Sequence, residues 1–176
     1  PYLTLPQLLA MHRPEPTSSA DASVRSTDTD ALVSRASAAS LGYLSDAFAP
    51  LFLPPSLRRS TEKRPPLINI GTHARTWAID ELVAQFLADA DSAGRQILSL
   101  GAGTDTRMWR MLDKAKAEGR PWACTRWVEV DFEEATGAKA RTISGKPVLR
   151  DPLGSNIKIG ERISGQKTRT RVRRRC

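Results

Sequence analysis

A glycine-rich turn lies between an apolar run and an amphipathic segment, and this combination constrains the fold more than any other feature of the sequence. The run Gln96–Leu100 is short and apolar, as buried parallel strands are. It leads directly into GAGTDT at residues 101–106, and residues 106–118 then place Met, Trp, Leu and Ala side chains at helical spacing. Strand, glycine turn and helix in this order predict the start of a parallel α/β sheet.

A second strand and a second helix follow this unit. Residues 126–132, RWVEVDF, have the β-branched and aromatic composition of a strand, and residues 133–141 are predicted to form a helix. Two such units in succession indicate the first half of a doubly wound α/β sheet. A chain of 176 residues has room for one domain with a sizeable core rather than for two.

Helices are also predicted before the first strand. One begins near residue 28, where Asp28 or Thr29 is expected to cap it, and ends at Gly42; the other spans residues 72–90. Five prolines in residues 47–66 indicate a surface loop between the two helices. The second helix is predicted from apolar residues at helical spacing, with acidic and polar residues between them: Ile79, Leu82, Val83, Phe86 and Leu87.

The two ends of the chain differ from its middle. Residues 1–27 are rich in Pro, Ser, Thr and Ala and are expected to form a flexible arm, while the basic residues 161–176 are expected to be disordered. Eight basic residues and one acidic residue lie between Lys158 and Cys176, so nearly all of the net charge of +8 belongs to this end. Because the rest of the chain is close to neutral, it lacks the basic face that binding to nucleic acid requires. No apolar run approaches the roughly 20 residues needed to cross a membrane.

The glycine turn and the end of the second strand outline a site for a cofactor that contains adenosine. Gly101 lets a ligand lie against the backbone, and Asp131 stands where such folds use a carboxylate to accept hydrogen bonds from both ribose hydroxyls. A dinucleotide fingerprint needs a third glycine where this chain has Thr106, and Asp105 adds negative charge where a pyrophosphate would lie. The pattern therefore favours S-adenosylmethionine, which has no phosphate, over NAD.

Four sequence blocks resemble the leucine carboxyl methyltransferase family in its fungal form: ALVSRASAASLGYLSD, INIGTHARTWAIDELVAQFL, QILSLGAGTDTRMWRML and WVEVDF. The resemblance covers residues 28–160, which are expected to be the N-terminal part of a methyltransferase domain. It implies an α/β, Rossmann-like S-adenosylmethionine-dependent methyltransferase fold, truncated after the first two strands, with N-terminal helices. It also implies methyl transfer to the C-terminal leucine α-carboxylate of the protein phosphatase 2A catalytic subunit, by a monomeric cytoplasmic enzyme.

Carried over position by position, the resemblance implies four cofactor contacts. Gly101 gives a close backbone approach, and Asp131 holds the ribose. Either Arg35 or Arg75 meets the carboxylate of the cofactor, and Arg75 is also a candidate to orient the substrate carboxylate. Ile70 departs from the family, whose pattern at this point usually reads INRG. Because a carboxylate is ionised at neutral pH, the transfer needs no general base, and neither a catalytic residue nor a metal ligand is assigned.

Other functions stay open at this point. The later strands of the family and most of its substrate-facing part have no counterpart here, so the chain is alternatively an inactive truncated fragment or a non-catalytic binding remnant. Relatives with the same fold methylate a carboxylate on a modified guanosine of transfer RNA, as wybutosine-type enzymes do, and these carry a repeat domain that has no counterpart in this sequence. An NAD-binding module is disfavoured by Asp105 and Thr106.

Overall fold

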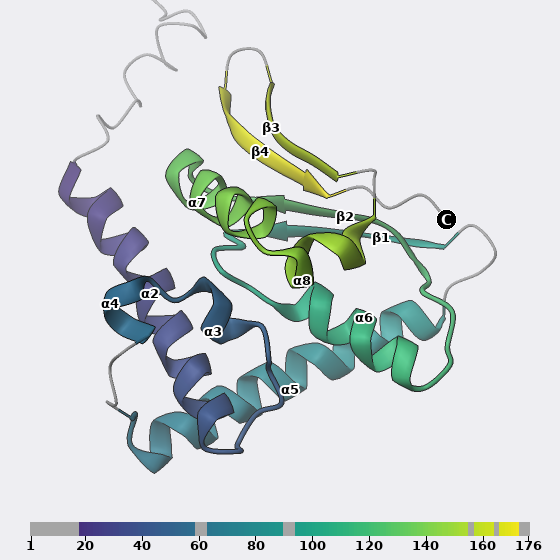
Figure 1. Ribbon diagram of the computed structural model, residues 1–176, viewed down its shortest axis with the longest axis horizontal. Coiled ribbons are helices and arrows are strands. Elements are labelled where there is room, and N and C mark those ends of the chain that lie inside the picture. The colour runs from purple at the N-terminus through teal and green to yellow at the C-terminus, as the bar shows by residue number, and fades with distance from the viewer. Residues whose placement is uncertain (1–17, 59–62, 90–93, 155–156, 164–165, 173–176) are drawn as a thin grey trace, which may run out of the picture.

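The computed structural model describes residues 18–58, 63–89, 94–154, 157–163 and 166–172. Its elements in chain order are α2 (Ser18–Ser40), α3 (Ala49–Phe52), α4 (Pro55–Arg58), α5 (Pro66–Ala88), β1 (Arg95–Leu100), α6 (Arg107–Ala117), β2 (Cys124–Val130), α7 (Glu133–Ser144), α8 (Pro147–Arg150), the 3₁₀-helix η1 (Asp151–Leu153), β3 (Ile157–Ile163) and β4 (Gln166–Val172). Figure 1 shows that α2 crosses α5 at one end of the molecule, while the β3–β4 hairpin lies at the opposite end. The glycine turn between β1 and α6 lies between these two ends.

A parallel pair of strands forms the centre of the fold. β1 and β2 pair from Gln96 with Arg126 to Leu100 with Val130, and helix α6 connects them. This βαβ unit confirms the prediction of an α/β fold. Because both strands run in the same direction, their carboxyl ends meet at one edge of the sheet. The turn after β1 therefore lies beside Asp131, the first residue after β2.

Two further strands extend the sheet beyond β2, where the sequence predicts truncation after two strands and a disordered segment over 161–176. β4 pairs antiparallel with β2, and β3 pairs antiparallel with β4, so the strand order is β1-β2-β4-β3. The prediction of disorder is corrected for the residues of these two strands. The reason is that β-branched residues recur through them, as in TRTRV at 168–172, and that β4 supplies hydrogen-bond partners to the open edge of β2. Positive charge alone does not prevent this backbone pairing.

Helix α2 begins at Ser18, although the sequence predicts a flexible arm followed by a helix only from Asp28. The correction has a simple cause, because no glycine or proline interrupts residues 18–40. The predicted end of the helix is correct. Gly42, with a φ of 79°, closes it with the two backbone hydrogen bonds of a Schellman motif. The part of the expected arm over residues 1–17 lies outside the described residues.

Helices α2 and α5 pack through small and polar side chains. Asn69 is fully buried, and its Oδ1 accepts a hydrogen bond from the Ser37 hydroxyl at 3.0 Å. Its side-chain amide donates to the carbonyl of Arg64 at 2.7 Å. Helix α5 begins at Pro66, earlier than predicted, since proline is well suited to the first helical position. This packing holds α5 across the end of α2 and thereby fixes the position of Arg75.

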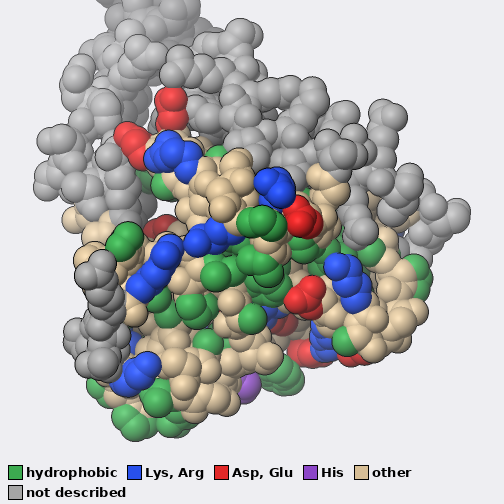
Figure 2. Space-filling model, in the orientation of Figure 1, with side chains coloured by type: hydrophobic (Ala, Val, Ile, Leu, Met, Phe, Trp, Pro, Cys, Tyr) green, Lys and Arg blue, Asp and Glu red, His purple; other side chains and the backbone are tan. Residues whose placement is uncertain are grey.

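The apolar face predicted for α5 lies largely at the surface. Ile79, Leu82 and Phe86 are 40%, 66% and 47% exposed, because periodicity identifies an apolar face but not what packs on it. On β1, Leu98 and Leu100 are 62% and 73% exposed. Figure 2 shows hydrophobic side chains at the surface among charged ones of both signs. Despite this exposed apolar surface, none of the described helices is both long and apolar enough to span a membrane.

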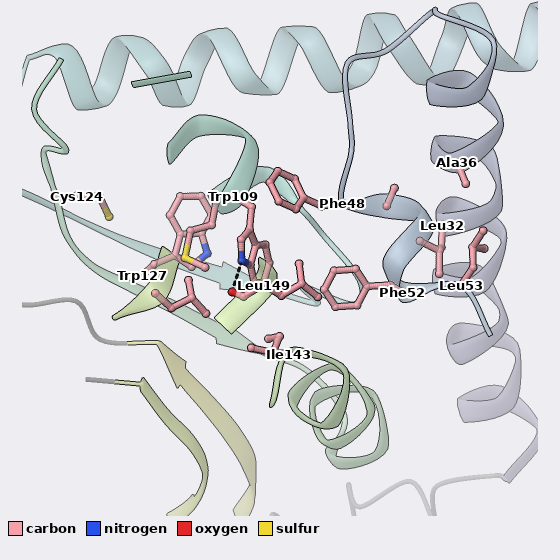
Figure 3. Close-up of a cluster of buried hydrophobic side chains, with 13 residues drawn as sticks. Leu32, Ala36, Phe48, Phe52, Leu53, Trp109, Cys124, Trp127, Ile143 and Leu149 are labelled. Atoms are coloured by element: carbon pink, nitrogen blue, oxygen red, sulfur yellow. Dashed lines mark hydrogen bonds between the residues drawn. The ribbon is translucent and has the colours of Figure 1, made fainter. Parts of the chain in front are cut away.

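The hydrophobic core gathers around Trp109 of α6, which is almost completely buried (Figure 3). Its indole N–H donates to the carbonyl of Leu149 in α8 at 2.8 Å. The rings of Phe48 and Phe52 lie tilted against it, with centroids 6.4 and 5.8 Å away. Trp127 of β2 is also buried in this cluster. The core therefore anchors α6, whose N-terminus follows the glycine turn.

Candidate functional site

A cavity of about 710 Å³ opens at the carboxyl ends of β1 and β2. All four site residues predicted from the sequence line it: Arg35 from α2, Arg75 from α5, Gly101 from the turn after β1, and Asp131 after β2. The segments that carry these residues are far apart in the chain, so the tertiary fold brings them together. The structure thus places every predicted site residue around one cavity.

The two glycines of the turn meet different needs. Gly101 and Gly103 have φ values of 63° and 46°, in the left-handed region that glycine adopts without steric cost. A Cβ on Gly101 would meet no described atom within 4 Å, so the backbone here borders open space that a ligand can approach. A Cβ on Gly103 would overlap the carboxylate of Asp28. The backbone at Gly101 is therefore open to a ligand, and the missing side chain of Gly103 allows α2 to approach the turn.

Carboxylates from both sides hold the backbone of the turn. The Asp28 Oδ1 accepts hydrogen bonds from the amide and the hydroxyl of Thr104, both at 2.8 Å. The Asp131 Oδ2 accepts one from the amide of Gly103 at 2.6 Å, and its Oδ1 accepts one from the amide of Phe132 at 2.6 Å. Because a carboxylate can accept about four hydrogen bonds, Asp131 retains capacity for the hydroxyl groups of a ligand.

Arg35 lies against the turn rather than in open solvent, and its side chain is 11% exposed. Its Nη2 donates to the carbonyl of Thr104 at 2.8 Å, and its Nη1 lies 3.4 Å from the Asp105 carboxylate. Burial lowers the pKa of Arg35, and the nearby carboxylates of Asp105, Asp46 and Asp28 oppose this effect. Since a guanidinium remains protonated at neutral pH, Arg35 supports the turn and adds positive potential to the cavity.

Acidic and basic side chains alternate in a series of ion pairs that includes three residues of the cavity lining, Asp105, Arg107 and Arg110. Asp105 pairs with Arg107, which also bonds to Asp80 at 2.8 Å. Asp80 in turn pairs with Arg110. Burial alone would raise the pKa of Asp105, but the charges of Arg107, Lys139 and Arg35, together with a hydrogen bond from the Arg107 amide, lower the pKa overall. Asp105 is therefore ionised, and its charge is neutralised by neighbouring cations.

A buried ion pair lies beside the turn, between the sheet and α7. Lys139 of α7 and Glu129 of β2 lie 2.6 Å apart, with side chains that are 2% and 4% exposed. The Lys139 Nζ also donates to the carbonyl of Asp105 at 2.8 Å and lies 5.5 Å from the centre of the Trp109 ring. Burial raises the pKa of Glu129, and the charge of Lys139 opposes this rise. The pair therefore ties the turn to β2 and α7 at once.

Arg75 is the predicted cation whose charge is most available to a ligand. It is exposed on α5 and makes no hydrogen bond or ion pair with the described part of the chain. Together with the open backbone at Gly101 and the carboxylate of Asp131, it completes a set of groups that fits a ligand with a carboxylate and a ribose.

A second groove, of about 780 Å³, runs between α5 and α6. Its lining includes the large side chains of Trp77, Met111 and Trp122, but none of the four predicted site residues. Its described lining residues also include no glycine turn and no carboxyl end of a strand, so the cavity at the carboxyl ends of the strands is the better candidate site.

Two residues that shape the site were not assigned to it from the sequence. Asp28 was predicted to cap a helix, but it lies inside α2 with its carboxylate on the turn. Lys139 occurs in no recognisable motif. Lys139 lies on the buried face of α7, together with Thr136, Ala140 and Ile143. Because a buried lysine almost always has a partner, its position on this face indicates that it pairs with another group.

Comparison with protein families agrees with the sequence blocks described above. The family model described as "Leucine carboxyl methyltransferase" matches residues 23–158. This range includes the glycine turn, both parallel strands and the helices that carry Arg35 and Arg75. The resemblance predicted from the sequence is therefore confirmed.

Curated proteins with this name share a large part of the chain. Leucine carboxyl methyltransferase 1 of Cryptococcus neoformans is 44% identical over 152 residues, which cover 80% of this chain and 40% of that protein. The protein of the same name from Aspergillus fumigatus is 44% identical over 134 residues, or 76% of this chain and 32% of the relative. The leucine carboxyl methyltransferase 1 homolog of Arabidopsis thaliana is 39% identical over 138 residues, or 78% and 38%. The matched part thus spans less than half of the length of these relatives.

Proposed function

Because the chain belongs to the leucine carboxyl methyltransferase family, we propose that it carries the part of a methyltransferase that binds S-adenosylmethionine. The proposed methyl acceptor is the α-carboxylate of the C-terminal leucine of the protein phosphatase 2A catalytic subunit. One observation carries the proposal: the four residues predicted to contact the cofactor line a single cavity, in a chain whose relatives are named for carboxyl methylation of leucine.

Each end of the cofactor has a matching group in the cavity. Asp131 accepts hydrogen bonds from the ribose hydroxyls, and the open backbone at Gly101 allows the ligand to lie against the chain. Arg75 pairs with the carboxylate of the cofactor through its exposed guanidinium, while Arg35 adds positive potential from within the protein.

The chemistry of the acceptor explains what this chain does and does not need to supply. S-adenosylmethionine supplies an electrophilic methyl group on its sulfonium. An α-carboxylate has a pKa of about 3.3–3.7 and is ionised at pH 7, so no side chain has to remove a proton from it. The contribution of the protein is to orient the carboxylate toward the methyl group of the cofactor. The turn that borders the cofactor is held rigid for this purpose by Asp28 of α2, Asp131 after β2 and Lys139 of α7.

The relatives also bear on the alternatives. Their shared name refers to the carboxyl group of leucine, which does not favour the modified guanosine of transfer RNA as the acceptor. A non-catalytic binding fragment stays as the second candidate, because the matched part of the chain spans less than half of the length of its relatives. The assay of methyl transfer separates this candidate from the proposed enzyme.

The acceptor is tested with S-adenosylmethionine that is radiolabelled in its methyl group. The chain is incubated with a peptide that carries the C-terminal tail of the phosphatase subunit, and with the same peptide amidated at its terminus. We expect a base-labile methyl ester on the free peptide and none on the amidated peptide, because only the former has an α-carboxylate. Equal labelling of both would contradict the proposed acceptor. Absence of labelling in a chain that binds the cofactor would favour the non-catalytic fragment instead.

A further inference from the structure

Asp28 occupies an unusual position for a carboxylate in the middle of a helix. It lines the same cavity as Arg75, Gly101 and Asp131, and it is only partly buried. Its Oδ1 accepts both hydrogen bonds from Thr104, so the side chain is held in one orientation. Its Oδ2 accepts no hydrogen bond from the described residues and is available to a ligand.

The other carboxylates around the cavity are already engaged or differently placed. Asp105 is neutralised by Arg107 and by Arg35. Both oxygens of Asp131 accept backbone amide hydrogens, and this residue stands at the strand end that holds a ribose. Glu134 is exposed on the first turn of α7. Asp28 is thus the carboxylate of the cavity that has a fixed orientation, an available oxygen and no ion pair with the described residues.

The charges of the cavity match the amino-acid end of the proposed cofactor. An α-amino acid carries an ammonium and a carboxylate side by side, so its recognition needs an anion and a cation in the same cavity. Arg75 supplies an exposed cation from α5, and Asp28 supplies an anion from α2. We infer that Asp28 accepts a hydrogen bond from the α-ammonium group of S-adenosylmethionine and thereby selects ligands that carry an amino-acid end. This inference rests on the proposed function.

The test compares two ligands that share the adenosine and the thioether. S-adenosylhomocysteine carries the amino-acid end, and 5′-methylthioadenosine lacks it. Each is titrated calorimetrically into the wild-type chain and into Asp28→Asn, whose amide oxygen can still accept the hydrogen bonds of Thr104. We expect the dissociation constant for S-adenosylhomocysteine to rise by about tenfold to a hundredfold, as loss of a hydrogen bond between charged groups implies, and that for 5′-methylthioadenosine to change by less than about twofold.

A matched control is available on the same helix. Asp30 pairs with Arg64 at the surface and does not line the cavity, so Asp30→Asn should change the affinity for neither ligand. Equal weakening of both ligands by Asp28→Asn would show that Asp28 only shapes the turn, and an unchanged affinity for S-adenosylhomocysteine would also overturn the inference. A wild-type chain that binds neither ligand would instead remove the proposed function on which the inference rests.

Discussion

Replacement of Glu129 by glutamine is expected to destabilise the protein by about 3 kcal/mol, because it removes the carboxylate in direct contact with the buried ammonium of Lys139. The side chains of this pair are 2% and 4% exposed, so solvent cannot take over the role of the missing carboxylate. The hydrogen bond from Lys139 to the carbonyl of Asp105 and the nearby Trp109 ring remain, but neither carries a full negative charge. The Asp105 carboxylate also remains nearby, but it already pairs with Arg107 and Arg35. Urea denaturation of the wild type and the variant measures the effect.

A double variant separates the cost of an unpaired charge from the loss of a stabilising contact. Glu129→Gln combined with Lys139→Met removes both charges, and it should recover most of the lost free energy of unfolding. Asp151→Asn is the matched surface control, since its pair with Arg150 is 64% and 51% exposed and should change stability by less than about 1 kcal/mol. A Glu129→Gln variant as stable as this control would contradict the account of the buried pair.

Replacement of Gly103 by alanine is expected to destabilise the turn by about 3 kcal/mol. An L-residue with a φ of 46° costs roughly 1–2 kcal/mol. The added Cβ would also overlap the Asp28 carboxylate, which cannot move without losing its hydrogen bonds to Thr104, worth about 1 kcal/mol each. The same variant should weaken the binding of S-adenosylhomocysteine, because the turn forms one wall of the cavity. Denaturation and calorimetry measure the two effects.

Gly119 provides the control for backbone strain alone. Its φ of 63° is also positive, but a Cβ there would meet no described atom within 4 Å. Gly119→Ala should therefore cost only the roughly 1–2 kcal/mol of strain and leave ligand binding intact. Equal destabilisation by Gly103→Ala and Gly119→Ala would show that contact with Asp28 contributes nothing. In a Gly103→Ala variant that also carries Asp28→Ala, the overlap is absent and the two effects should be less than additive.

Two residues of the site, Gly101 and Asp131, could be predicted from the sequence because they occur in short, contiguous patterns. The turn that contains Gly101 follows an apolar strand, and Asp131 ends the next strand, so the parallel pairing of β1 with β2 is enough to bring them together. Arg35 and Arg75 were placed by resemblance to the family alone. The structure shows them in the same cavity, while their role toward the cofactor stays a proposal.

The contacts that support the site could not be predicted, because they join residues that are distant in the chain. No local pattern indicates that Asp28 reaches Thr104, or that Lys139 meets Glu129 on the buried face of α7. The same limit applies to the apolar face of α5. The spacing of Leu82 and its neighbours identifies one apolar face correctly, but whether another element covers that face is a property of the whole fold.

The end of the chain was mispredicted for a different reason. Its net positive charge favoured disorder, whereas backbone pairing depends on the open edge of β2 and on β-branched residues within β3 and β4. Charge patterning describes how a segment interacts with solvent and with other charges, and it is a weaker guide to local backbone structure than edge pairing.

Calorimetric titration of S-adenosylhomocysteine into the 176-residue chain tests the central claim most directly, with Asp131→Ala and Asp113→Ala as variants. Asp131 lines the proposed cofactor cavity, whereas Asp113 is exposed on α6 and does not. We predict a micromolar dissociation constant that Asp131→Ala abolishes and Asp113→Ala leaves unchanged, with thermal denaturation confirming that both variants are folded. A folded wild-type chain that does not bind the ligand, or binding that survives Asp131→Ala, would contradict the assignment of this cavity to S-adenosylmethionine.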